Sequence, residues 1–232
     1  MTQPSIAQLE PRKTPVQARS TASVDAILEA TVQVLLDVGK EQLTTTKVAL
    51  RAGVSVGTLY QYFPNTSALL QAVLKQHLSE VIEAIERVCQ NQKGEPLEKM
   101  ATALITAFLE AKMKDVKTSV ALYSVSGDVD GAAIVKQMGN RSNKAIVALL
   151  ESASEPFTTD PGLIASMLQG AMFGVSRRML ESGSPERQFE SSRRELIVLA
   201  CAYLNACSVR RQSEAPKSAY LARNFSPRLH TT

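Results

Sequence analysis

Residues 44–63 read TTTKVALRAGVSVGTLYQYF. Thr44 and Thr45 offer hydroxyl groups that can cap a first short helix, and Ser55 can cap a second. Gly53 lies between these helices and can take the left-handed backbone conformation that ends one helix and redirects the chain. The stretch therefore predicts a helix-turn-helix motif over about residues 43–63.

The apolar residues of this stretch fit the same geometry. Val48 and Ala49 fall on one face of the first helix, and Leu59 points inward from the second. The outward residues of the second helix are all uncharged: Val56, Gly57, Thr58, Tyr60, Gln61 and Tyr62. Small residues let a helix enter the major groove of DNA, and hydroxyl groups and N-terminal amides can bind phosphates. We therefore expect this surface to face DNA.

A family resemblance adds to this interpretation. The run AGVSVGTLYQYFPN (52–65) followed by SALLQAVL (67–74) closely resembles the DNA-binding domain of TetR-family (tetracycline-repressor-like) transcriptional regulators. The resemblance covers roughly residues 19–80. It implies phosphate contacts by Thr45, Tyr60 and Tyr62, and base-edge positions for Thr46, Val56, Gly57 and Thr58. Thr46 and Thr66 stand where the family often has a cation. The expected DNA-binding residues are Thr45, Thr46, Lys47, Ser55, Val56, Gly57, Thr58, Tyr60, Tyr62 and Thr66.

Helical periodicity continues through the rest of the chain, which predicts an all-α protein. Residues 65–91 contain no helix breaker and predict one long helix that can belong to both halves of the molecule. We expect a three-helix DNA-binding unit at the N-terminus, followed by a larger helical effector-binding and dimerisation domain. The expected divisions are a flexible arm (1–18), the TetR-type DNA-binding domain (19–80), the ligand-binding and dimerisation domain (81–209) and a disordered basic tail (210–232).

Two strongly amphipathic stretches, at about 161–181 and 185–209, predict the last two helices. In the family that this chain resembles, the final two helices of each subunit form a four-helix dimer bundle, which implies a homodimer. Ser166, Gly170 and Gly174 are small residues four apart, and they allow a second helix to approach closely. The alternative is that both helices are core elements of a monomer. The expected interface residues are Met167, Gly170, Ala171, Gly174, Leu196, Ala200, Tyr203 and Leu204.

The methionines of the larger domain fall on helix faces, where most should fill the core. A subset of such residues can line an adaptable apolar pocket, and the family resemblance implies a small apolar or amphipathic effector. The residues expected nearer to that pocket are Phe108, Met113, Tyr123, Met138, Met172 and Arg177.

Charge and composition limit the other function classes. The net charge is +4, but residues 209–232 hold five Lys/Arg against one Asp/Glu, so the basic excess belongs to the tail. The sequence has no N-terminal signal and no apolar run long enough to span a membrane, so we expect a cytoplasmic protein. Its three cysteines include no Cys-x-x-Cys pair, so neither a disulfide framework nor a zinc site is expected. No cofactor is expected either.

Residues 53–57 spell Gly-x-Ser-x-Gly, the nucleophile-elbow pattern of serine hydrolases. An elbow needs a strand before the serine, whereas here a helix is expected, and the only histidines are His77 and His230. We therefore expect no enzyme and keep a serine hydrolase as a remote alternative. The main hypothesis is a ligand-responsive transcriptional repressor that binds a palindromic operator as a homodimer and is released by a small molecule. The nearer alternative is a helix-turn-helix activator, or a regulator that acts without a ligand.

Overall fold

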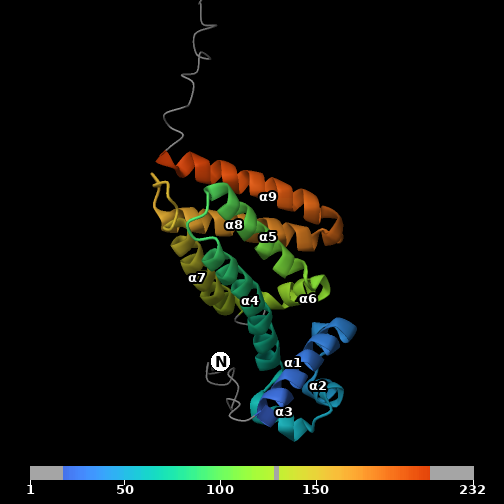
Figure 1. Ribbon diagram of the computed structural model, residues 1–232. Helices are drawn as coiled ribbons and strands as arrows, with labels where there is room; N and C mark the ends of the chain where they lie inside the picture. Colours follow the sequence, from blue (N-terminus) through green and yellow to red (C-terminus); the bar gives the residue numbers. More distant parts are fainter. Residues whose placement is uncertain (1–17, 128–130, 210–232) are drawn as a thin grey trace, which may run out of the picture.

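The computed structural model describes residues 18–127 and 131–209, so the predicted basic tail, and the predicted arm apart from Ala18, lie outside the described residues. The described residues form nine α-helices and one short 3-10 helix, η2 (Figure 1). Apart from an isolated bridge between Phe157 and Ser208, they contain no β-pairing. The predicted all-α fold is confirmed. The bounds are α1 Ala18–Val38, η2 Lys40–Gln42, α2 Thr45–Ala52, α3 Val56–Tyr62, α4 Thr66–Asn91, α5 Leu97–Met113, α6 Val116–Ser126, α7 Gly131–Leu150, α8 Pro161–Glu181 and α9 Pro185–Cys207.

The predicted helix-turn-helix forms from local hydrogen bonds. The side chain of Thr44 accepts a hydrogen bond from the backbone N–H of Lys47 (3.2 Å) and caps α2. The side chain of Ser55 accepts one from the N–H of Thr58 (2.9 Å) and caps α3. Gly53 lies between the two helices with φ 68° and ψ 27°, in the left-handed region. The chain can turn there because glycine has no Cβ to clash with the following carbonyl group.

We expect Gly53→Ala to lower the free energy of unfolding by about 1 kcal/mol, because alanine is strained at positive φ. A Cβ at Gly53 would have no heavy atom within 4 Å, so crowding adds nothing to this strain. Gly139→Ala is the matched control, since Gly139 lies inside α7 and its Cβ would also have open space. The control should raise the free energy of unfolding by up to about 1 kcal/mol, because alanine has a higher helix propensity than glycine. Urea unfolding of both variants checks the pair, and a Gly53→Ala protein as stable as the wild type would contradict the account.

The buried side chains form two clusters, and α4 contributes to both. The N-terminal cluster joins α1, α2, α3 and the first half of α4 to Leu122 and Val125 of α6, and it includes Ile27, Leu59 and Leu74. The second cluster joins the rest of α4 to α5, α7, α8 and α9. Figure 1 shows α4 running from the small N-terminal unit into the larger helical body. The single long helix predicted from the sequence is confirmed as α4, whose 26 residues span roughly 39 Å.

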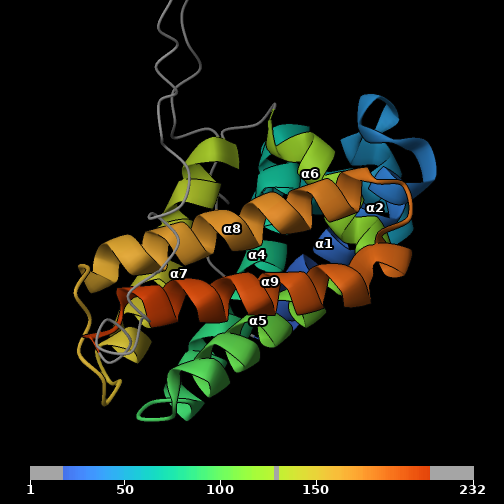
Figure 2. The ribbon, with the colours of Figure 1, turned by 90° about the horizontal axis from the view of Figure 1, so that it is seen from above.

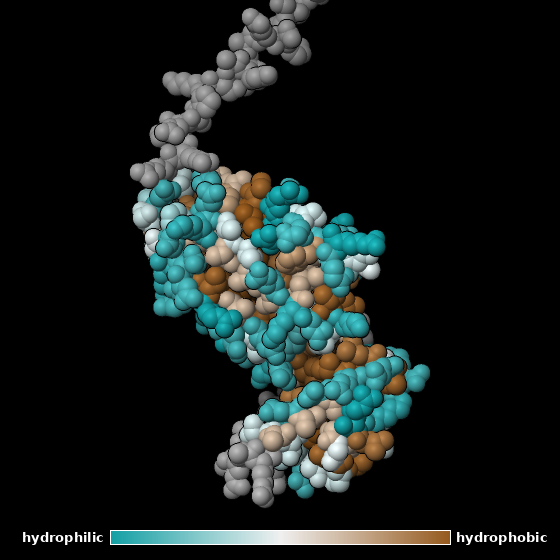
Figure 3. All heavy atoms as spheres, turned by 45° about the vertical axis from the view of Figure 1, so that its right-hand side comes forward, coloured by the Kyte–Doolittle hydropathy of each residue, from teal (hydrophilic) through white to brown (hydrophobic). Residues whose placement is uncertain are grey.

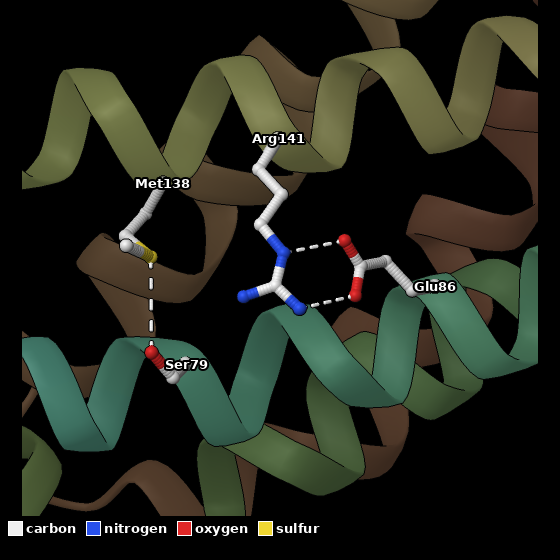
Figure 4. Close-up of polar contacts among 4 residues, drawn as sticks. All are labelled: Ser79, Glu86, Met138 and Arg141. Carbon is white, nitrogen blue, oxygen red and sulfur yellow. Dashed lines mark hydrogen bonds and ion pairs between the residues drawn. The ribbon is translucent and has the colours of Figure 1, made fainter.

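Helix α7 is fixed against α4 by polar contacts between the two helices (Figure 4). Arg141 forms a two-pronged ion pair with Glu86, with Nε–Oε1 2.6 Å and Nη2–Oε2 2.5 Å. One turn earlier on α7 and two turns earlier on α4, the Ser79 hydroxyl donates to the Met138 Sδ atom at 3.9 Å. Planar pairing of this kind fixes orientation as well as distance. The contacts hold α7 at one side of α4, where Met138 forms part of a cavity wall described below.

Helices α8 and α9 lie side by side and cover one end of the body (Figures 1 and 2). Pro161 and Pro185 each occupy the first turn of their helix, where a missing N–H costs nothing. In the part of the chain that the structure describes, no helix is both long enough and apolar enough to cross a membrane.

Candidate nucleic-acid interface and ligand cavity

Helix α3 turns one side inward and leaves the rest on the surface. Leu59 is fully buried in the N-terminal cluster, as the sequence pattern predicted. Tyr60 is 41% exposed, and Val56 and Gly57 are exposed as well. The helix therefore presents a small, uncharged surface that begins at its positive N-terminal end.

One hydrogen bond links α2 to this surface. The hydroxyl groups of Thr45 and Tyr60 lie 3.0 Å apart. Thr45 is only 8% exposed and lies inside α2, so it does not share the capping role of Thr44 that the sequence suggested. Its hydroxyl group instead positions the Tyr60 phenol, which is the accessible member of the pair. This tertiary contact joins residues fifteen positions apart.

The predicted DNA-binding residues differ in exposure. Lys47 is exposed and donates from Nζ to the Gln42 carbonyl oxygen at 2.9 Å. Arg51 is paired with Asp37 at 2.6 Å. Neutral donors thus make up most of the surface around α3. Thr46, Lys47, Ser55, Val56, Gly57 and Tyr60 are exposed, Thr58, Tyr62 and Thr66 are half-buried, and Thr45 is buried.

Ser55 has a structural task that accounts for the Gly-x-Ser-x-Gly pattern. Its hydroxyl oxygen caps α3 and lies 2.8 Å from the Thr58 hydroxyl. The element before it is α2, whereas a nucleophile elbow places its serine after a strand. The pattern therefore reflects a turn between two helices.

A cavity of about 330 Å³ lies within the larger body, between α4, α5, α6, α7 and α8. Most of its walls are apolar, with Leu78, Ile82 and Phe173 among the lining side chains. A concave, mainly apolar site with a few polar groups is the usual form of a small-molecule site. The polar lining residues are His77, Lys112, Ser119, Tyr123, Ser126, Ser176 and Arg177.

Half of the residues predicted for a pocket line this cavity, namely Tyr123, Met138 and Arg177. Phe108 and Met172 do not, because both are fully buried in the second cluster. Met113 also lies outside the lining and packs against that cluster from its edge. These three side chains do not border the cavity because they pack against other apolar residues on the helix faces.

Sequence reasoning missed His77, Lys112 and Ser119 as cavity residues. The sequence did carry a signal for Lys112, which continues the buried stripe of α5 one turn beyond Phe108. A charged residue on an apolar stripe must find a partner or a cavity. Ser119 had no comparable signal, because the apolar residues of α6 show no clear helical periodicity in the sequence.

The cavity residues His77 and Ser119 form a connected pair. The Ser119 hydroxyl donates to the Lys112 carbonyl oxygen at 2.8 Å, and its Oγ lies 3.1 Å from His77 Nε2. Burial lowers the pKa of His77 to about 4, with a further contribution from nearby Lys112, while Asp115 acts in the opposite direction. His77 is therefore neutral at physiological pH.

Lowering the pH should destabilise the protein through His77. The unfolded chain binds a proton near the ordinary pKa of 6.5 and the folded chain near 4, so stability falls as the pH drops through this window. Between pH 7 and pH 5 we expect a loss of about 1–2 kcal/mol from this residue. Urea unfolding at both pH values should show a smaller loss for His77→Gln, which keeps a donor near Ser119. Equal losses in both proteins would contradict this assignment.

The two cations of the cavity have different surroundings. Arg177 is exposed, and its Nε donates to Glu181 at 3.0 Å. Its guanidinium also lies 5.1 Å from the centre of the Tyr123 ring. Lys112 is half-buried, and desolvation lowers its pKa.

A second surface, on α8 and α9, exposes apolar side chains. Met167 is 52% exposed and Leu199 is 49% exposed, although both lie in the middle of their helices. Gly170 and Gly174 are exposed on the same helix as Met167. We call Leu163, Met167, Gly170, Gly174, Val198, Leu199 and Ala202 the α8–α9 face.

The predicted interface needs a correction on α9. Leu196, Ala200 and Leu204 are buried in the second cluster of this chain, with Leu196 only 3% exposed. They face α5 and α8 of the same subunit, so they are not available to a second copy. Ala171 and Tyr203 are half-buried. The exposed apolar residues of α9 include Val198, Leu199 and Ala202 instead.

The chain is similar in sequence to known regulators. It is 33% identical to the fatty acid metabolism regulator protein of Bacillus subtilis over 82 residues, which are 35% of this chain and 42% of that protein. It is 31% identical to the HTH-type transcriptional repressor KstR of Rhodococcus jostii over 145 residues, 61% of this chain and 65% of that protein. The chain thus spans less than two thirds of either relative's length.

Solved structures share the fold. A regulator of the TetR family from Mesorhizobium loti superposes with a TM-score of 0.68 at 20% identity, covering 83% of this chain and all of that one. The SmeT–triclosan complex superposes with a TM-score of 0.62 at 20% identity, covering 89% of this chain and all of that one. Another SmeT structure is that of the repressor of the Stenotrophomonas maltophilia multidrug efflux pump SmeDEF.

Two family models match separate parts of the chain. The model for bacterial regulatory proteins of the tetR family matches residues 27–73, which contain α2 and α3. The model for the tetracyclin repressor-like C-terminal domain matches residues 96–204, which reach from the start of α5 nearly to the end of α9. Together they cover more than half of the sequence, and the chain therefore belongs to the TetR family of transcriptional regulators.

Proposed function

We propose that this regulator is a repressor that binds a palindromic operator as a homodimer and is released when a small molecule occupies its cavity. The observation that carries the proposal is the double role of α4. Its first half packs under the exposed surface of α3, and its residues from Leu74 to Ile82 form one wall of the cavity. A ligand in the cavity therefore contacts the same rigid helix that supports the DNA-binding unit.

The α8–α9 face supports the homodimer. Helices α8 and α9, which carry this face, lie at the end of the body away from the DNA-binding unit (Figure 1). Two copies joined there by a twofold axis would present two α3 helices to one side. Such a pair reads a palindrome when its recognition helices lie about 34–36 Å apart, or a multiple of that distance.

The operator DNA is released if the ligand binds more tightly to a dimer whose two α3 helices have a different spacing. A ligand shifts a conformational equilibrium only by binding one state more tightly than the other. His77 lies in the cavity wall and also faces a groove of about 600 Å³ beside α1. Figure 3 shows hydrophobic residues at the surface where the small unit meets the body. This junction, which includes Leu28 and Leu36 of α1, is where a change in the cavity would reach the DNA-binding unit.

The cavity favours a ligand-controlled regulator over one that acts without a ligand. The SmeT–triclosan complex, which shares the fold, supports this choice because it contains a bound small molecule. The matching families and relatives are transcriptional regulators, which supports a regulator without catalytic activity.

The test begins with the selection of bound fragments from random DNA by the purified full chain. Metabolites and drugs are then screened for release of the selected fragment. Release by at least one compound, together with an enriched symmetric sequence, would support the proposal. A defined DNA site that no compound releases would favour the ligand-independent alternative.

We expect Tyr60→Phe to weaken binding to selected and to unrelated DNA alike by about 1 kcal/mol. We expect the exposed phenol to donate a hydrogen bond to a phosphate, and phosphate contacts carry no sequence information. Titrations of both duplexes at one salt concentration check the result. A variant that changes sequence preference, while its binding to unrelated DNA stays the same, would show that Tyr60 contacts bases.

A further inference from the structure

We propose, resting on the ligand-controlled function above, that the effector is an organic anion with an apolar body, whose carboxylate or similar group binds the Lys112 ammonium. The apolar body would occupy the space beside Leu78, Ile82 and Phe173. The inference depends on three features of the cavity: the absence of acidic lining residues, the neutral state of His77, and the absence of a partner for Lys112.

No Asp or Glu belongs to the lining among the described residues. The ionisable side chains there are basic or weakly acidic: His77, Lys112, Tyr123 and Arg177. A cationic ligand would therefore meet Lys112 and Arg177 as like charges, and it would find no carboxylate to offset its loss of water. The lining thus selects against cations.

His77 cannot supply the positive charge for an anion. The single hydroxyl proton of Ser119 is donated to the Lys112 carbonyl oxygen, so Ser119 Oγ must accept from His77. The neutral imidazole therefore carries its proton on Nε2 and leaves Nδ1 as an acceptor. This network also ties α6 to the end of α5 at the residue that carries the ammonium group.

Arg177 is already compensated, whereas Lys112 is not. Arg177 pairs with Glu181 and lies over the Tyr123 ring. Among residues 18–127 and 131–209, no carboxylate or other acceptor lies within bonding distance of Lys112 Nζ. Neighbouring Lys114, by contrast, lies 3.9 Å from Glu80. A partly desolvated cation without a partner has lost part of its hydration and gained no ion pair, and a bound anion would supply that pair.

The experiment compares ligands that share a body and differ in head group, using the full-length protein and calorimetric titration. One set is decanoate, decan-1-ol and decyltrimethylammonium, and an aromatic set is 2-naphthoate and 2-naphthol. In at least one set we expect the carboxylate to bind at least about tenfold more tightly than its neutral analogue. Equal or weaker binding of both carboxylates, or no binding by either, would overturn the proposal.

Variants of Lys112 then locate the charge. Lys112→Met should lower the affinity for the preferred carboxylate at least about tenfold and leave the neutral analogue unchanged. Lys112→Arg should restore part of the preference, and the control Lys114→Met should change neither affinity. Thermal unfolding shows that each variant is folded. Unchanged carboxylate binding in Lys112→Met would contradict the assignment.

Release of DNA is measured separately on the same proteins. Lys112-dependent carboxylate binding without release would refute ligand control by this anion and leave the assigned ligand class intact. Release by the neutral analogue alone would support ligand control and refute the ligand class.

Discussion

Gly57→Glu is expected to reduce operator affinity at least about 100-fold, roughly 3 kcal/mol, while the protein stays folded and dimeric. Gly57 is exposed in the first turn of α3, where a carboxylate would lie against the phosphates and hold the helix away from the groove. A Cβ at this position lies 3.7 Å from Ser55 Oγ, an ordinary contact, so the fold has room for it. A carboxylate in the first turn also favours the helix.

The control for net charge is Gln90→Glu, which makes the same charge change at an exposed site near the far end of α4. Its operator affinity should stay close to that of the wild type. Fluorescence titrations of both variants on the selected duplex measure the difference. If Gly57→Glu binds as well as the control does, α3 is not the helix that enters the groove.

Leu199→Arg is expected to convert the dimer into single subunits and to lower operator affinity on the order of 100-fold. Leu199 is 49% exposed on the α8–α9 face, so a second copy would bury it. An unpaired guanidinium at the centre of an apolar interface costs several kcal/mol. The core of the subunit should be unaffected because the side chain points away from it.

Val120→Arg is the matched control, because Val120 is 41% exposed on α6 and lies outside the α8–α9 face. Sedimentation velocity at the concentration used for DNA binding should show a dimer for this control and a monomer for Leu199→Arg. Dimers in both variants would place the subunit interface elsewhere.

The helix-turn-helix could be predicted because its chemistry is local. Thr44, Gly53 and Ser55 each act within four residues of their own position, through two caps and one left-handed turn. Thr45 shows where such reasoning ends. Its hydroxyl group forms a hydrogen bond with Tyr60, fifteen residues away, and no local pattern contains that contact.

The exposed α8–α9 face coincides only in part with the predicted interface residues, for a related reason. Leu196, Ala200 and Leu204 form the clearest apolar stripe of α9. An apolar stripe shows that a helix face is buried, but not whether the same chain or a second copy buries it. The structure shows that α5 and α8 of the same chain cover these residues. Leu199 lies beside that stripe, within the apolar run LIVLACAYL (196–204), so the sequence does not show which residues of the run stay exposed.

The cavity could not be derived from the sequence because its walls come from five helices. Spacing along one helix shows which residues face inward, but not where the inward faces leave a gap. Phe108 and Lys112 lie on the same stripe of α5, yet one fills the core and the other borders the cavity. Lys112 could have been found by asking what a lysine on that stripe would pair with.

The central claim is that two copies of this chain, joined at the α8–α9 face, bind one symmetric DNA site through their α3 helices. The most direct test determines the sequence of the DNA selected from a random pool and the number of chains bound to each duplex. The account predicts an inverted repeat with half-sites one helical turn apart, or a multiple of one turn, and two chains for each repeat. A selected site without symmetry, or one chain bound to each duplex, would contradict it.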